Sequence, residues 1–283
     1  MTVDPTKVGT PLEGSPTSWD SKDALLYALG VGAGAEDPLK DLKYTTENSE
    51  GVAQEVLPTF VTVMTGSVGK HPTELVGSVP RSSILHGEQK VILHRTIPTA
   101  GTVVSEGKIA GIYDKGKHAN LVTSSVLKDP TSGASYAEVQ VTLVLRGEGG
   151  FGGDPGPAAH WEVPARKPDE IVSYPTKVDQ ALLYRLNGDR NPLHSDPAFA
   201  AKAGMKRPIL HGLCTYGFAG RALLAAVADD DPSQFGEFSV RFASTVNPGD
   251  LLDTLIWRTD DGAIFQTKVG ETVVLDRGVF HLR

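Results

Sequence analysis

Similar words recur along this chain at a nearly constant spacing, and this recurrence constrains the fold more than any other feature. One pair lies 157 residues apart and two others 150 residues apart. Landmarks repeated in the same order indicate a duplicated structural unit, although chance similarity between short apolar words is the alternative. The pairs are Ala24–Leu29 with Ala181–Leu186, Leu57–Phe60 with Arg207–Leu210, and Ile97–Gly101 with Val246–Asp250.

Each copy passes from helical into β-patterned sequence. We expect a short helix, a longer helix and then sequential antiparallel strands in each half, because short turns separate the β-rich runs. The expected strands are Gln89–His94, Thr102–Tyr113, Leu121–Leu127 and Ala137–Arg146 in the first half, and Phe238–Phe242, Leu251–Arg258, Ala263–Val269 and Thr272–Leu282 in the second.

The glycine- and proline-rich stretch Gly147–Pro168 separates the two copies. This composition is typical of a flexible linker. We therefore expect two domains, residues 1–148 and 169–283, joined by residues 149–168.

Composition excludes several classes of protein. A net charge of -7 with no long basic run argues against a nucleic-acid partner. The longest apolar stretches are too short to span a bilayer, so no membrane insertion is expected. A single cysteine, Cys214, cannot form an intramolecular disulfide and fits a reducing compartment. The N-terminus lacks the apolar region of a secretory signal, so we expect a cytoplasmic protein.

A short polar turn in the second half carries the residues best suited to chemistry. Asp189, Asn191, Pro192 and His194 follow a helix-ending Asn-Gly pair. Pro192 restricts its own backbone and that of Asn191, so the turn is stiff enough to hold the two titrating side chains inward. A carboxylate and an imidazole can act as an acid/base pair. The plainer interpretation is a capped polar turn.

The next helical segment begins at His211-Gly212. The N–H of Gly212 is one of the unpaired donors of a first helical turn and could stabilise a developing enolate oxygen. A glycine needed only for close packing is the alternative. Together with the polar turn, this helix start favours a catalytic site.

The first copy lacks the titrating pair. Ala35 stands at the position of Asp189, and Lys40 at the position of His194. We interpret the first half as a structural unit that shapes a binding cavity for the second.

Other chemistry receives less support. Cys214 lies in the first helical turn, where a nucleophilic role is conceivable, but a buried structural cysteine is commoner. Asp189, His194, His211 and Cys214 could supply metal ligands, yet no second cysteine pair accompanies them, and we expect no metal. The glycine patterns at 147–152 and 30–35 lack the strand-to-helix context of a dinucleotide site.

The stretch Tyr184–Pro197 resembles the signature of the (R)-specific enoyl-CoA hydratases, also called hydratase 2 or MaoC-like dehydratases. It reads Tyr-x-Leu-Asn-Gly-Asp-x-Asn-Pro-Leu-His-x-Asp-Pro. The resemblance extends from Trp19 to Phe280. Further matching words are Asp23–Gly34, Leu57–Phe60, Leu85–Gln89 and Tyr113–Lys117 for the non-catalytic half, and Pro208–Cys214, Arg241–Ala243 and Pro248–Gly249 for the catalytic half.

The long form of that family carries two hot-dog folds in one chain. The resemblance therefore implies an α+β double hot-dog, in which two antiparallel sheets each wrap a long central helix. It also implies reversible syn addition of water to a trans-2-enoyl-CoA, giving a (3R)-3-hydroxyacyl-CoA in fatty-acid or related metabolism. No cofactor is implied, since coenzyme A belongs to the substrate, and a homodimer is the family expectation.

The resemblance assigns roles by position. Asp189 and His194 are the implied acid/base pair, Asn191 helps to position them, and the Gly212 N–H polarises the thioester carbonyl. The implied substrate-binding residues are His86, Gly87, Lys115, Arg190, Pro192, Leu193 and Phe242.

Three other functions stay open. A hot-dog thioesterase hydrolyses acyl-CoA, a non-catalytic subunit binds acyl thioesters without turnover, and a related dehydratase acts on carrier-protein thioesters. The complete Asp-x-Asn-Pro-Leu-His motif argues against the first two.

Overall fold

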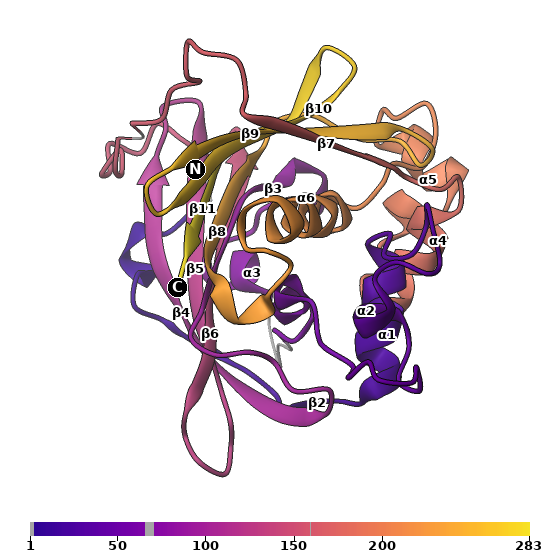
Figure 1. The fold of residues 1–283 in the computed structure, drawn as a ribbon. Helices are drawn as coiled ribbons and strands as arrows, with labels where there is room; N and C mark the ends of the chain where they lie inside the picture. Colours follow the sequence, from indigo (N-terminus) through magenta and orange to yellow (C-terminus); the bar gives the residue numbers. More distant parts are fainter. Residues whose placement is uncertain (1–2, 66–70, 159) are drawn as a thin grey trace.

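The computed structural model describes residues 3–65, 71–158 and 160–283 of the chain (Figure 1). A curved antiparallel sheet of eleven strands holds the helix α6 (Gly212–Val227) in its hollow, and several shorter helices lie on the far side of α6 (Figure 1). The strand order is β1-β4-β5-β6-β3-β8-β11-β10-β9-β7, with β2 paired to β4 outside this path.

The strands follow the β-rich sequence. Those of the N-terminal half are β1 (Pro11–Glu13), β2 (Thr17–Trp19), β3 (Ile84–Leu93), β4 (Gly101–Asp114), β5 (His118–Lys128) and β6 (Ser135–Arg146). Those of the C-terminal half are β7 (Glu170–Pro175), β8 (Phe235–Phe242), β9 (Leu251–Thr259), β10 (Gly262–Val269) and β11 (Thr272–Leu282). All eight strands expected from the sequence are confirmed, most of them longer than expected.

The other helices of the described residues are all shorter than α6. The α-helices are α1 (Ser21–Gly30), α2 (Leu42–Thr45), α3 (Pro72–Val76), α4 (Gln180–Tyr184) and α5 (Pro197–Lys202). The 3-10 helices are η1 (Pro5–Lys7), η2 (Pro58–Val63), η3 (Arg81–Ser83), η4 (Arg185–Asn187), η5 (Pro192–His194) and η6 (Pro232–Gln234).

The recurring word Ala-Leu-Leu-Tyr forms two helices that pack against each other, α1 and α4. Tyr27 of α1 and Tyr184 of α4 occupy equivalent positions, and their ring centroids are 6.2 Å apart. A Cβ at Gly30 would come within 2.8 Å of the Asn187 amide, so glycine permits this close approach. The pairing supports the duplication inferred from sequence.

Two expectations about the architecture need correction. The two sheets are continuous, because β3 pairs with β8 from Glu88 opposite Arg241 to Ile92 opposite Glu237. In the described part of the first half, the expected longer helix is replaced by η2 and α3, which are both short. Prolines at 58 and 72 begin these two elements and interrupt the helical sequence. Within the described residues, α6 is the one long helix in the hollow of the joined sheet (Figure 1).

The linker is irregular, as expected, but it is tied to the protein rather than free. The Asp114 carboxylate accepts hydrogen bonds from the N–H groups of Gly150 (2.8 Å) and Gly152 (2.7 Å). The Trp161 indole donates to the Gly278 carbonyl at 3.1 Å. The core also spans both halves, since Phe60 of the first half and Phe238 of the second belong to one buried cluster. The domain boundaries near residues 148 and 169 stay a prediction.

No helix in the described ranges combines the length and apolar character that a bilayer crossing requires.

Candidate active site

The polar turn is built by its own backbone hydrogen bonds. Gly188, with φ 123°, ends the helical segment. The N–H of Asn191 then donates to the Asp189 carboxylate at 3.1 Å. The Asn191 side-chain oxygen accepts from the N–H of Leu193 at 3.0 Å and caps η5, which begins at Pro192. Asn191 therefore shapes the turn through its backbone N–H and its capping oxygen.

His194 is oriented by a main-chain carbonyl. Its Nδ1 donates to the Ile209 oxygen at 2.9 Å, and because a carbonyl only accepts, the neutral ring carries its proton on Nδ1. Nε2 is then left as an acceptor. The side chain is 8% exposed, and this burial lowers the pKa of His194, against the opposing effects of the Ile209 hydrogen bond and the Asp189 charge. His194 is thus held as a neutral base.

Asp189 differs from His194 in exposure. The residue is exposed, and its carboxylate lies within 4.8 Å of a ring nitrogen of His194. A solvated carboxylate beside a buried neutral imidazole offers two acceptors to one water molecule.

The first turn of α6 supplies donors to the same region. His211 is the N-cap, and its carbonyl accepts from the N–H groups of Cys214 and Thr215. Among the described residues, the N–H groups of Gly212 and Leu213 have no acceptor. A Cβ at Gly212 would lie 3.2 Å from the Phe242 ring. The site therefore combines free helix-start donors with a carboxylate and a neutral imidazole.

These groups line one cavity of about 290 Å³, which we call the inner cavity. Its wall comes from both halves of the chain. The lining residues are Ile84, Leu85, His86, Asp189, Asn191, Leu193, His194, Ile209, Leu210, Gly212, Leu213, Thr215, Phe242, Ser244, Thr245, Val246, Val274 and Leu275.

A larger outer cavity of about 660 Å³ shares Phe242 with the inner one. Three cationic side chains line it, namely Lys115, Arg241 and Arg277. Lys115 also donates to the Pro155 carbonyl, and Arg241 pairs with Asp276 at 3.2 Å. Such a cavity suits a phosphate-bearing group, whereas the mainly apolar inner cavity suits a hydrocarbon chain.

His86 stands where the two cavities meet. Its ring packs edge-on against Phe242, with centroids 4.7 Å apart. Burial lowers the pKa of His86 to about 4, against the opposing effects of the Glu88 main chain, the Gln89 side chain and the Asp189 charge. Its buried Nε2 has no hydrogen-bond partner among the described residues.

Comparison with known proteins identifies the family. Residues 18–147 match the MFE-2 hydratase 2 N-terminal domain, and residues 161–278 match the MaoC like domain. The chain is 46% identical to 3-hydroxyacyl-thioester dehydratase Y of Mycobacterium tuberculosis, over 98% of each protein. The chain belongs to the MaoC-like dehydratase and hydratase 2 family.

Two further relatives place this MaoC-like chain in context. It is 42% identical to peroxisomal multifunctional enzyme type 2 of Drosophila melanogaster, over 90% of this chain but only 44% of that enzyme. The crystal structure of a MaoC-like dehydratase from Phytophthora capsici matches with a TM-score of 0.86 and 30% identity, covering 99% of this chain and 98% of the other. The double hot-dog expected from the sequence is confirmed.

The MaoC-like chain brings most of the expected site residues together. Asp189, Asn191, His194 and Gly212 line the inner cavity with His86, Leu193 and Phe242. Gly87 and Lys115 line the outer cavity. Arg190 and Pro192 are exposed and line neither cavity, because the turn directs them to the surface. Their role in substrate binding therefore has no support from the geometry.

Sequence reasoning gave no role to Arg277, and it considered His211 only as a helix-start residue and a possible metal ligand. Arg277 lies in β11 at a left-handed φ of 52°, and only the folding of that strand brings it to the outer cavity. The signal in the sequence that could have pointed to His211 is its position at a helix start, directly before Gly212.

Cys214 is structural. It is fully buried, and its Sγ donates to the Gly30 carbonyl at 3.3 Å. Burial raises the pKa of the thiol, so the thiolate that a nucleophile requires is disfavoured. The Cys214 side chain faces α1. It does not belong to the group formed by Asp189, His194 and His211, whose possible metal-ligand atoms lie within 4.8 Å of one another.

Proposed function

We propose that this protein catalyses the reversible syn addition of water to a trans-2-enoyl-CoA, giving a (3R)-3-hydroxyacyl-CoA. The observation that carries the proposal is the inner cavity, where the acceptors Asp189 and His194 share a wall with the free N–H of Gly212. The relative named 3-hydroxyacyl-thioester dehydratase Y supports the same reaction class.

In this proposal each group has one part in the reaction. The Gly212 N–H donates to the thioester oxygen and stabilises the enolate that forms when hydroxide adds at C3. His194 Nε2 takes a proton from the water, whose oxygen forms the bond to C3. The same imidazolium returns a proton to C2 on the same face, which makes the addition syn. The Asp189 carboxylate accepts the second hydrogen of the water and holds it in place.

The two cavities divide the substrate between them. The apolar inner cavity takes the enoyl chain, and the outer cavity takes the coenzyme A arm past Phe242. Lys115, Arg241 and Arg277 then face its phosphates, since cationic side chains are the usual partners of that group.

Hydration of crotonyl-CoA and of a longer trans-2-enoyl-CoA tests the proposal. We expect the absorbance of the conjugated thioester to fall, and a (3R)-specific dehydrogenase to oxidise the product. Release of free coenzyme A would instead identify a thioesterase. Binding of both thioesters without any change in absorbance would identify a non-catalytic binding subunit.

We further propose that the enzyme works without a metal or redox cofactor, as a cytoplasmic homodimer. The proposed hydration neither oxidises nor reduces the substrate, so no electron carrier is needed. Extensive dialysis against EDTA should leave kcat unchanged, and light scattering should give twice the chain mass. Cell fractionation tests the location, which rests on the single cysteine of the chain.

A further inference from the structure

His211 lies directly behind the acid/base pair and outside both cavities. It is the N-cap residue of α6, its side chain is 1% exposed, and it lines neither the inner nor the outer cavity. It therefore cannot touch a substrate held in them. Any part it plays in the reaction is transmitted through its neighbours.

Two contacts connect His211 to both members of the pair. Its Nε2 donates to the main-chain oxygen of Asp189 at 3.2 Å. Its ring stacks on that of His194, with centroids 3.8 Å apart and an interplanar angle of 27°. The ring of Tyr184 encloses it on another side, at 4.9 Å.

These contacts require one protonation state. Because the Asp189 oxygen only accepts, the proton of the neutral ring is on Nε2. Nδ1 is buried and has no partner among the described residues, so a second proton there would find no acceptor. The facing charged groups are Asp189, which favours the imidazolium, and His194 and Arg185, which oppose it. Burial is the largest influence and lowers the pKa of His211 to about 4.

We propose that His211 is a positioning residue, whose neutral ring holds the Asp189 main chain by a hydrogen bond and supports His194 by stacking. The inference rests on the proposed hydration. During that reaction His194 becomes an imidazolium, and the face of a neutral aromatic ring against a cation is a favourable contact. A turn that shifts by about 1 Å can lower the rate about a hundredfold.

Two substitutions separate the two contacts. His211→Phe keeps a ring against His194 but removes the donor to Asp189. His211→Gln keeps an N–H donor near that oxygen but removes the ring. Tyr216→Phe is a matched control, because Tyr216 is also buried on α6, donates to the Phe238 carbonyl at 2.9 Å, and lines neither cavity.

We expect His211→Phe to lower kcat by about 10- to 100-fold with little change in KM, since the loss acts on alignment and not on substrate binding. The acidic limb of its pH–rate profile should stay in place, because the ring still shields His194. We expect His211→Gln to lose less of kcat and to move that limb to higher pH, because water gains access to His194.

NMR titration of the His194 imidazole gives a readout that does not require activity. The pKa of His194 should rise in His211→Gln and stay unchanged in His211→Phe and Tyr216→Phe. Wild-type kcat in both folded His211 variants would overturn the proposal, and so would equal His194 titrations in all four proteins. A wild-type enzyme that fails to hydrate any enoyl-CoA would refute the proposed function, while the titrations would still test the placement of His211.

Discussion

Asp189 and His194 owe their different properties to their surroundings. Asp189 is exposed and accepts a hydrogen bond from the N–H of Asn191. His194 is buried, with Nδ1 bound to the Ile209 carbonyl. One side chain thus stays a solvated acceptor, while the other is a neutral base of fixed orientation. Both lie on one short turn, so neither needs a large movement to reach the same water.

Substitution of either residue should abolish most activity and preserve the fold. We expect His194→Gln to lower kcat by about 10²- to 10⁴-fold, the usual contribution of a general acid or base. Asp189→Asn should lower kcat by about a hundredfold, because the water is no longer held in place by the carboxylate. Steady-state hydration kinetics and circular dichroism check this expectation. Asp196→Asn is the matched control, because Asp196 only caps α5 by accepting from the N–H groups of Ala198 and Phe199. Near-wild-type kcat in either active-site variant would refute the assignment.

The acidic limb of the pH–rate profile should lie below the ordinary histidine pKa of 6.5. Burial disfavours the imidazolium of His194, so the neutral base persists as the pH falls through that value. A profile of kcat/KM against pH measures the midpoint directly. A midpoint above 6.5 would mean that His194 is not the base or is not buried in the working enzyme.

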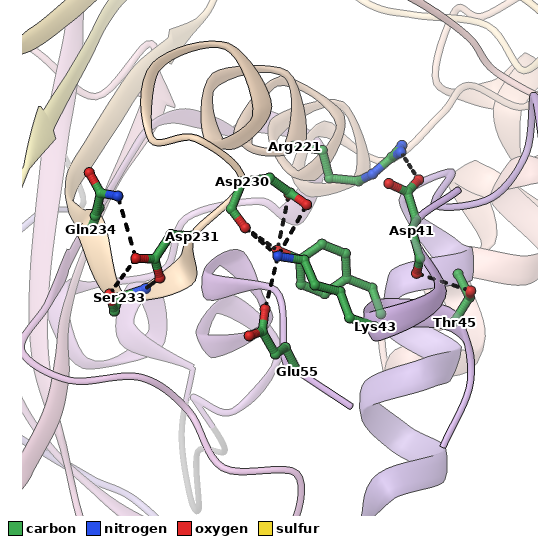
Figure 2. Close-up of polar contacts among 10 residues, drawn as sticks. Asp41, Lys43, Thr45, Glu55, Arg221, Asp230, Asp231, Ser233 and Gln234 are labelled. Carbon is green, nitrogen blue, oxygen red and sulfur yellow. Dashed lines mark hydrogen bonds and ion pairs between the residues drawn. The ribbon is translucent and has the colours of Figure 1, made fainter. Parts of the chain in front are cut away.

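At the scale of elements, α6 connects the site to the N-terminal half of the chain. Its first turn forms part of the site, and its middle and far end are fastened to the N-terminal half (Figure 2). Arg221 of α6 is 8% exposed and pairs with Asp41 at 2.7 Å, and Lys43 bridges Glu55 and Asp230. Lys43 belongs to α2, and Asp41 is the N-cap residue of that helix. These contacts orient the helix whose start supplies the N–H donors.

Removal of the Asp41 charge should destabilise the protein without changing the chemistry. Asp41→Asn leaves the buried Arg221 guanidinium without its counter-ion, and breaking such a pair costs about 3 kcal/mol. Asparagine also tolerates the left-handed φ of 59° at this position. Urea unfolding measures the loss, and kcat of the folded enzyme should stay the same.

Glu55→Gln serves as the control for that experiment. Its partner Lys43 keeps Asp230, and the Glu55 side chain is 43% exposed, so the pair should contribute less than about 1 kcal/mol. Equal losses of unfolding free energy in the two variants would show that the Arg221–Asp41 pair stabilises the protein no more than the Lys43–Glu55 pair.

At the scale of the whole molecule, the site lies at the joint between the two halves. His86 and Lys115 come from the first half, while Asp189 and Gly212 come from the second. The joint itself is the pairing of β3 with β8. A chain that lost this pairing would keep its polar turn but lose one wall of both cavities.

Buried histidines also make the molecule sensitive to acid. The pKa of His211 is about 4 when folded and 6.5 when free, so the unfolded chain binds more protons between these values. The stability that this residue contributes is therefore fully present above pH 6.5 and is lost as the pH falls toward 4. His86 acts in the same direction.

Urea unfolding at a series of pH values between 7 and 4 measures this dependence. In His211→Gln the slope should be shallower, because one titrating group has been removed. A free energy of unfolding that stays constant from pH 7 to pH 4.5 in the wild type would contradict the buried neutral state of both histidines.

Local sequence determined much of this protein. The alternation of β-branched and apolar residues predicted eight strands, and the recurring helical word predicted a short helix in each half. The order Asp189, Asn191, Pro192, His194 predicted a stiff polar turn because each interaction within it spans only a few residues. Such features depend on neighbours along the chain and can be inferred without a structure.

Only the tertiary structure decided the rest, because the deciding contacts join residues far apart in sequence. The pairing of Glu88 with Arg241 merged two expected sheets into one. Folding placed His86 against Phe242 and the ring of His211 against that of His194. Burial at these contacts lowers the pKa values of the three histidines, and burial is a property of the packed molecule that no local pattern carries.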